Sequence, residues 1–132
     1  MVEFSLLLTA LMFGGTVLYA FGFAAFVFTA LPADTAGPLI RRAFPHFYLF
    51  VIGTSAVAGA VVAFFDPLSA GILAAIAVSG LYARQVLMPK INRATDDGEK
   101  ARFKKLHGFS VVITLAHIAA AAVVIIKIAS AT

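Results

Sequence analysis

The feature that most restricts the fold of this chain is a series of four long apolar segments, at about residues 4–31, 44–65, 67–88 and 108–128. Roughly 20 consecutive apolar residues are needed for a helix to cross the hydrocarbon core of a bilayer. The first segment contains no charged residue and is longer than an upright helix requires, so we expect it to tilt or to project from the membrane. The sequence predicts an all-α polytopic membrane protein, a single domain over residues 1–132, whose four transmembrane helices form an antiparallel bundle.

The composition excludes an ordinary soluble domain. Hydrophobic residues make up 62% of the chain and charged residues 12%, whereas soluble domains contain about 45–50% apolar and about 25% charged residues. A soluble fold of 132 residues has too little interior to bury so much apolar surface. Because the chain has no cysteine, disulfides, thiolate metal sites and a thiol nucleophile are also excluded.

Turn and capping residues mark the ends of the segments. Asp66-Pro67 predicts a helix N-cap followed by a first-turn proline, so the second and third helices should form a tight hairpin. Pro89 is expected at the exit of the third helix, and Asp96-Asp97-Gly98 predicts a turn in the polar connector that follows. Pro45 predicts a kink in a helix that begins earlier, near Thr35. Small residues spaced four apart, at Ala10/Gly14, Ser55/Gly59 and Ala70/Ala74, predict close helix packing.

The charges predict the direction in which the chain crosses the membrane. Nine of the ten basic residues fall on one side of the predicted bundle: Arg41, Arg42, Arg84, Lys90, Arg93, Lys100, Arg102, Lys104 and Lys105. The other side holds only Glu3, Asp66 and Lys127. The positive-inside rule therefore predicts a protein of a bacterial-type inner membrane, with both termini on the non-cytoplasmic side. The basic side should contact anionic lipid headgroups.

Two other interpretations of the charges are not favoured. No basic residue precedes the first apolar segment and no A-x-A-like site follows a short core, so we expect a retained helix rather than a signal peptide. The run Lys100–Lys105 carries no interleaved stacking aromatic except Phe103, so no nucleic-acid partner is predicted.

The fourth segment carries the residues most suggestive of function. His107, Ser110, Thr114, His117 and Ala121 are separated by three, four, three and four residues, which places them on one face of a helix. We expect this face to point into the bundle, because a polar group that faces lipid lacks hydrogen-bonding partners. His117 should lie near the bilayer midplane, in a layer with small or hydroxyl residues of the other helices: Gly14, Gly15, Thr16, Thr54, Ser55 and Ser79.

A second polar layer is predicted nearer the cytoplasm. His107 lies roughly three turns from His117 along the helix, at the level of His46, Tyr48, Tyr82 and Arg84. An ionisable group inside a membrane is a candidate for function, so the two layers suggest a pocket or path from the cytoplasmic face to mid-membrane. The candidate ligand-binding residues are His107, Ser110, Thr114, His117, His46 and Arg84. The structural alternatives are a hydrogen-bonding strut for His117, and interfacial positions for the other histidines and for Arg84.

No cofactor is required by the sequence. His107 and His117 are the candidates for a metal site, since neutral imidazole binds soft metals. His46 and His107 are the candidates for haem, because they share a depth on different helices, although no second pair lies deeper. G-x-S-x-G, H-E-x-x-H and P-loop motifs are absent, and no carboxylate lies within a span, which favours a role other than catalysis.

Several short motifs together resemble a known family. They are Gly14-Gly15, Ala36-Gly37, Phe44-Pro45, Pro89, Asn92-Arg93, and Phe103 with Leu106, His107 and Ser110. In order and spacing they are similar to the transmembrane protein 205-like family, a four-span membrane domain of unknown function of the DUF4149 type. The resemblance implies the four-span architecture and no settled activity. The sulfur ligands invoked for an animal member's link to platinum-drug resistance have no counterpart in a chain without cysteine.

Three functions are therefore compatible with the sequence. The first is a small membrane module that binds or transports a small solute or a metal at its histidine-containing interior. The second is a non-catalytic accessory or structural subunit of a respiratory or photosynthetic complex. The third is a haem- or quinone-binding redox protein. Since one bundle of this size makes a poor conduit, we expect a homodimer or a place within a larger assembly.

Overall fold

The computed structural model describes every residue from Met1 to Thr132. The chain forms four helical rods, each long and apolar enough to cross a membrane, and no strand: Val2–Ala30, Ala33–Val62, Pro67–Asp96 and Lys100–Ser130. The prediction of an all-α protein with four membrane-crossing helices is confirmed. Each rod is about 30 residues long, so at roughly 1.5 Å per residue it exceeds the hydrocarbon thickness of about 30 Å and leaves at least one turn outside it.

Two of the rods are interrupted by π-helical segments. The first rod consists of α1 (Val2–Val17), the π-helical η1 (Leu18–Phe23) and α2 (Ala24–Ala30). The third consists of α4 (Pro67–Tyr82), the π-helical η2 (Ala83–Leu87) and α5 (Met88–Asp96). The second and fourth are the continuous helices α3 (Ala33–Val62) and α6 (Lys100–Ser130).

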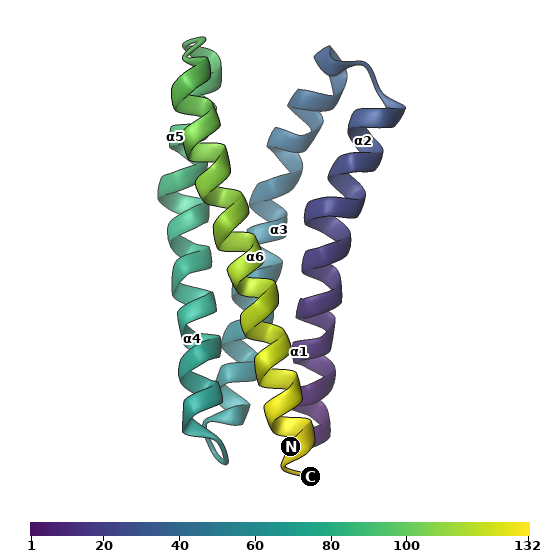
Figure 1. Ribbon diagram of the computed structural model, residues 1–132, viewed down its shortest axis with the longest axis vertical. Helices are drawn as coiled ribbons and strands as arrows, with labels where there is room; N and C mark the ends of the chain where they lie inside the picture. Colours follow the sequence, from purple (N-terminus) through teal and green to yellow (C-terminus); the bar gives the residue numbers. More distant parts are fainter.

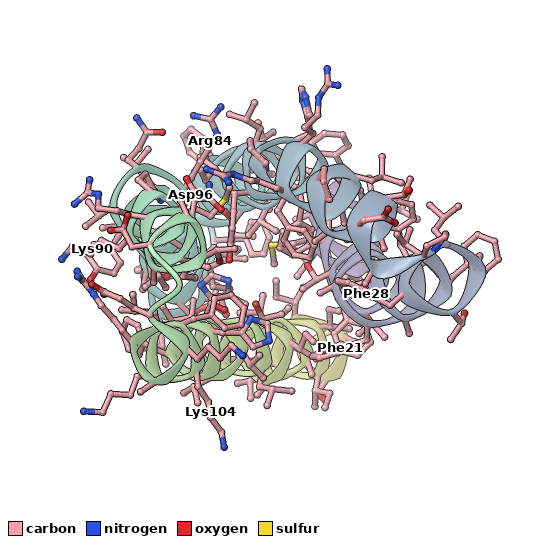
Figure 2. The ribbon with its side chains drawn as sticks, turned by 90° about the horizontal axis from the view of Figure 1, so that it is seen from above. Phe21, Phe28, Arg84, Lys90, Asp96 and Lys104 are labelled. Atoms are coloured by element: carbon pink, nitrogen blue, oxygen red, sulfur yellow. The ribbon has the colours of Figure 1, made fainter.

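The arrangement of the rods is antiparallel. Figure 1 shows both termini at the end where α3 turns into α4, while the α2–α3 link and the α5–α6 turn lie at the opposite end. That second end belongs to the half of the bundle that carries nine of the ten basic residues, and we call it the basic half. Seen from above, Arg84, Lys90 and Asp96 lie on the α4–α5 side, whereas Phe21 and Phe28 lie on the α1–α2 side (Figure 2).

Pro89 does not end the third helix, and this prediction is wrong. The helix continues through α5 to Asp96, well beyond the predicted boundary at residue 88. Proline removes one backbone donor and its ring collides with the carbonyl four residues before it. Here the wider turn of η2 directly precedes the proline and accommodates it, as π-segments do inside longer helices.

Helix α3 begins at Ala33, well before Pro45, and continues through both Pro38 and Pro45. Two side chains from neighbouring rods donate hydrogen bonds to its backbone at this level. The Tyr19 hydroxyl lies 2.9 Å from the carbonyl oxygen of Ala43, and Arg84 Nε lies 3.1 Å from that of Pro45. Both donors belong to the π-helical segments, η1 and η2. Two of the four rods, the first and the third, therefore depart from regular α-helix beside the proline-containing part of α3.

The predicted caps and turns are present. Asp66 is the N-cap of α4, where it accepts hydrogen bonds from the Ser69 amide at 3.3 Å and the Ser69 hydroxyl at 2.6 Å. Gly98 has a φ of +68°, a left-handed conformation that glycine adopts without strain, and it ends the turn between α5 and α6. Helix α3 ends at Val62, three residues before its predicted boundary, so a short turn precedes the cap.

Helices α3 and α4 pack closely through small residues, as predicted. A Cβ atom placed on Gly59 would lie 3.3 Å from Leu73 Cβ and 3.6 Å from the carbonyl oxygen of Ala70. One placed on Gly80 would lie 3.2 Å from Ile52 Cγ1. Close backbone approach of this kind provides the dispersion contacts that hold membrane helices together. Ala10 and Gly14, in contrast, are exposed and make no such contact, so the packing prediction is wrong for that pair.

Two ion pairs tie the ends of the bundle. Arg41 of α3 binds Asp96 of α5 through two hydrogen bonds of 2.7 and 2.9 Å in the basic half. At the opposite end, Lys127 Nζ of α6 lies 2.6 Å from Asp66 Oδ2. Sequence reasoning missed both pairs, because their members lie 55 and 61 residues apart along the chain.

Candidate functional site

The centre of the candidate site is the imidazole of His117, near the middle of α6. Only 7% of the residue's surface is exposed, and its Nε2 atom lies 2.7 Å from Ser79 Oγ on α4. Ser79 was predicted to share the layer of His117, and the structure brings the two together. They form a side-chain hydrogen bond between the middle of α4 and the middle of α6, far along both helices from the Lys127–Asp66 pair.

The Ser79 hydroxyl has a second acceptor within reach, and its choice of acceptor is linked to the tautomer of His117. The Ser79 hydroxyl also lies 2.7 Å from the carbonyl oxygen of Ala75 on its own helix. A hydroxyl has one hydrogen, so when it donates to Ala75 the imidazole Nε2–H must donate to Ser79. In that neutral tautomer Nδ1 is the acceptor nitrogen of the ring.

The Nδ1 atom of His117 has no hydrogen-bonding partner in the protein. Every fully enclosed side-chain nitrogen or oxygen in the structure does have a partner. It follows that Nδ1 is not fully enclosed and retains some accessible surface. The imidazole is held at one nitrogen and open at the other.

The remaining residues of the predicted α6 stripe show a gradient of exposure. Thr114 is buried beside His117, Ser110 is half-buried and His107 is exposed. The Thr114 hydroxyl donates to the carbonyl of Ser110 at 3.0 Å, and that of Ser110 donates to the carbonyl of His107 at 2.6 Å. Both hydroxyl protons are therefore used within α6, and the oxygen atoms remain acceptors.

The structure does not bring His46 and His107 into the interior. Both are exposed, and the His107 ring stacks on Phe103 one turn away, with centroids 5.5 Å apart and planes 8° from parallel. Because both rings are exposed, they do not provide a buried bis-imidazole site of the kind expected for haem ligation. No group of three or more His, Asp or Glu side chains lies close enough to hold a metal ion.

Arg84 has a structural role at the edge of the site. It is half-buried, its Nε donates to the carbonyl of Pro45, and its Nη1 donates to Gln85 Oε1 at 2.7 Å. The guanidinium therefore spans from η2 to α3, rather than reaching only to headgroups as snorkelling would require.

The family relationship was tested against models of known domains. The model described as Domain of unknown function (DUF4149) matches residues 7–100. The chain belongs to this family. No curated protein and no solved structure matches the chain. The part that matches DUF4149 includes Ser79 and Arg84 but stops at the start of α6, so His117 and Thr114 lie beyond it.

Sequence reasoning missed Ser5 and Thr9 in the polar interior of this DUF4149 chain. With Thr16, which was predicted in the layer of His117, and with Met12 they form a buried stripe on α1, and none of the four is more than 2% exposed. Their spacing of four, three and four residues is the same helical signal that identified the α6 stripe. Each hydroxyl donates to a carbonyl of its own helix, so the stripe allows close packing and adds no free polar atom.

Proposed function

We propose that this DUF4149 protein binds a small polar solute within the membrane, between α4 and α6, and that His117 is the residue that contacts it. The observation that supports this most strongly is the half-satisfied imidazole: Nε2 is held by Ser79 while Nδ1 has no partner and borders accessible space. A residue that served only as a strut between helices would not need an open second nitrogen. A bound solute would supply the missing hydrogen bond.

The acceptor character of the site suggests the kind of solute. When the Ser79 hydroxyl bonds to Ala75, Nδ1 accepts a hydrogen bond, and the Thr114 oxygen one turn away is a second acceptor. A small molecule with N–H or O–H donors, such as an amine or an amide, matches this pair. A zinc ion would find only one imidazole and hydroxyl oxygens here, a poorer ligand set than structural zinc sites use.

A route to the site is suggested by the exposure gradient on α6. From His107 through Ser110 to Thr114, side chains on one helix face pass from exposed to buried over roughly 10 Å of helix. We propose that solute enters along this face from the basic half. His107 and Ser110 would line the outer part of the route, with His46 and Arg84 near the same level of the bundle.

The proposal includes an orientation. The basic half should face the cytoplasm of a bacterial-type inner membrane, with both termini on the other side. Because the chain has no cysteine, Asp97→Cys and Ala131→Cys variants each supply a single thiol. In right-side-out membrane vesicles an impermeant maleimide should label Ala131→Cys and spare Asp97→Cys, and the reverse labelling would invert the orientation.

The proposal also includes the state in which the protein acts. One bundle of 132 residues encloses little space, so we propose a homodimer or a place in a larger membrane assembly. Chemical cross-linking in native membranes would distinguish self-contacts from contacts with other proteins, and a chain that forms neither contradicts this part. Within the family, we propose membership of the transmembrane protein 205-like group on the motifs Gly14-Gly15 and Phe44-Pro45.

The binding proposal is tested by nuclear magnetic resonance on protein with ¹⁵N-labelled histidine in lipid nanodiscs. Ammonium, methylamine, acetamide and zinc are added in turn, and the three histidines are assigned by substitution. We expect at least one of the three hydrogen-bond donors to shift the His117 Nδ1 resonance saturably. The same probe should leave His117→Leu protein unbound, while His107→Gln protein retains the His117 response. If no probe moves the His117 nitrogens, the imidazole is a packing element and the proposal fails.

A further inference from the structure

An open groove of about 610 Å³ lies on the first rod, and no residue of the proposed solute site lines it. Leu11, Gly15, Leu18, Gly22 and Phe26 line it along α1, η1 and α2, and Phe50 of α3 closes one side. Leu18 and Phe26 are 69% and 66% exposed, so the groove opens outward rather than into the bundle. Its lining has no exposed polar surface, so its occupant there must be apolar.

Two glycines create the groove. A Cβ atom on Gly15 would lie 2.6 Å from the Phe50 ring, so the ring rests directly on the backbone of α1. A Cβ atom on Gly22 would meet only the flexible end of Leu18, at 3.2 Å. Seven residues, or roughly two turns, separate the glycines. The absence of a side chain at Gly15 admits the Phe50 ring as a wall of the groove, and its absence at Gly22 leaves the groove open about 10 Å farther along the rod.

A polar row that includes an arginine continues from the groove toward the basic half. Arg42 and His46 precede Phe50 by eight and four residues on α3, in one row of the helix surface, and both are exposed. The Tyr19 hydroxyl bonds to the carbonyl of Ala43, which places Arg42 beside the η1 part of the groove. Neither the Arg42 nor the His46 side chain makes a hydrogen bond or ion pair with another residue. Arg41, the residue before Arg42, is in contrast paired with Asp96.

We propose that this surface binds one anionic phospholipid. An acyl chain lies in the groove over Gly15 and Gly22, and the phosphate accepts hydrogen bonds from Arg42 with the His46 imidazole as a second donor. Arginine matches a phosphate through two parallel N–H donors. A second copy of this chain would bring the same arginine and a net charge of +4 to the surface, whereas the phospholipid brings the opposite charge at the depth of Arg42.

The first test counts the lipids that remain bound. The protein is reconstituted in vesicles of phosphatidylcholine and phosphatidylglycerol with identical acyl chains. It is then extracted, and native mass spectrometry measures its mass with the lipids that remain bound. We expect one phosphatidylglycerol to be retained in preference to phosphatidylcholine. Arg42→Gln should reduce the preference about fivefold, the effect of one basic residue near a phosphate. Lys104→Gln, an exposed cation on α6, should leave it unchanged.

The groove itself is tested by filling it. Gly22→Leu should abolish lipid retention, whereas Gly71→Leu, at an exposed glycine of α4 with open space around it, should not. Equal retention of the two lipids by the wild type, or retention unchanged in Gly22→Leu protein, overturns the proposal. A dimer that carries no lipid and dissociates in Gly22→Leu protein overturns it in favour of a second copy.

A second experiment leaves the groove unfilled, so it remains informative if the Gly22→Leu protein does not fold. The chain has no tryptophan, so Leu18→Trp supplies a single reporter inside the groove. Brominated phosphatidylglycerol should quench its fluorescence more than brominated phosphatidylcholine, and Arg42→Gln should remove the difference. Val78→Trp, 68% exposed on α4, is the control and should show no difference. Equal quenching of Leu18→Trp by both lipids contradicts the proposal.

Discussion

His117 Nε2 and Ser79 Oγ lie 2.7 Å apart and join α6 to α4 by a side-chain hydrogen bond near the middle of the bundle. The buried hydroxyls of Thr9, Thr16, Ser55 and Thr114 instead bond to carbonyls of their own helices. At this contact a polar interaction, and not shape alone, fixes how α4 and α6 face each other. It also holds the imidazole so that Nδ1 is left open.

Loss of the hydrogen bond between Ser79 and His117 should lower the stability of the protein by weakening the packing of α4 on α6. Ser79→Ala removes the partner of Nε2, and we expect the free energy of unfolding to fall by about 0.6–2 kcal/mol, the range for hydrogen bonds between membrane helices. Ser110→Ala removes a hydroxyl that bonds only within α6 and should change stability little. Reversible unfolding in mixed micelles measures both. Equal losses from the two variants would show that the cross-helix bond contributes nothing of its own.

The close approach of α3 and α4 should depend on Gly59. A leucine there would collide with Leu73 and the Ala70 backbone, and overpacking of this kind costs about 1–3 kcal/mol. Gly53→Leu is the matched control, since Gly53 lies on the same helix with no neighbour within 4 Å of an added Cβ. Thermal unfolding in one detergent should separate the two variants. If Gly53→Leu is as destabilising as Gly59→Leu, the loss of stability does not come from the close approach of α3 and α4.

The Asp66 cluster should make stability depend on acid. Hydrogen bonds from Lys127 and then Ser69 lower the pKa of Asp66 from 3.8 to about 2. Because the folded-state pKa is depressed, the contribution is fully present above pH 3.8 and is lost as the pH falls through about 2. Unfolding measured across this window should show that Asp66→Asn removes part of the wild-type slope, while Asn still serves as an N-cap. Asp34→Asn, which pairs with no basic side chain, should keep the slope. An unchanged slope in Asp66→Asn would contradict the assigned pKa.

The hydrogen bond from the Tyr19 hydroxyl of η1 to the Ala43 carbonyl should stabilise the packing of the first rod on α3. Tyr19→Phe keeps the ring stacked on Phe47, at a centroid distance of 5.2 Å, and removes only the hydroxyl that bonds to Ala43. We expect a loss of about 0.5–1.5 kcal/mol. Tyr82→Phe is the control, because the Tyr82 hydroxyl has no partner and the residue is 42% exposed. Hydrogen exchange of the α3 amides near Pro45 should rise in the first variant and not in the second.

The four crossings could be predicted because hydropathy alone determines them, and the cap at Asp66 could be predicted because its partner Ser69 is three residues away. Helix ends near proline could not. Whether the helix ends at Pro89 depends on the π-helical segment η2 before it, and no local sequence pattern predicts that segment. The depth match of Ser79 and His117 followed from counting residues along straight rods.

The outward position of His107 could not be predicted from its stripe. Helical spacing puts His107 on the face of His117, but exposure also depends on whether a neighbouring rod covers that end of α6. The ion pairs of Arg41 with Asp96 and of Lys127 with Asp66 depend in the same way on which rods are adjacent. The spacing of residues along the sequence does not show which rods are adjacent.

The most direct test of the central claim is the chemical reactivity of His117 alone. In His46→Gln/His107→Gln protein the imidazole of His117 is the only one left, and its acylation by diethyl pyrocarbonate in lipid nanodiscs can be followed by mass spectrometry. An imidazole bound at Nε2 and open at Nδ1 should react measurably but far more slowly than His46 or His107 in the corresponding single-histidine proteins, and a bound solute should slow it further. A reaction as fast as that of the exposed histidines, or none until the protein is unfolded, would contradict the account.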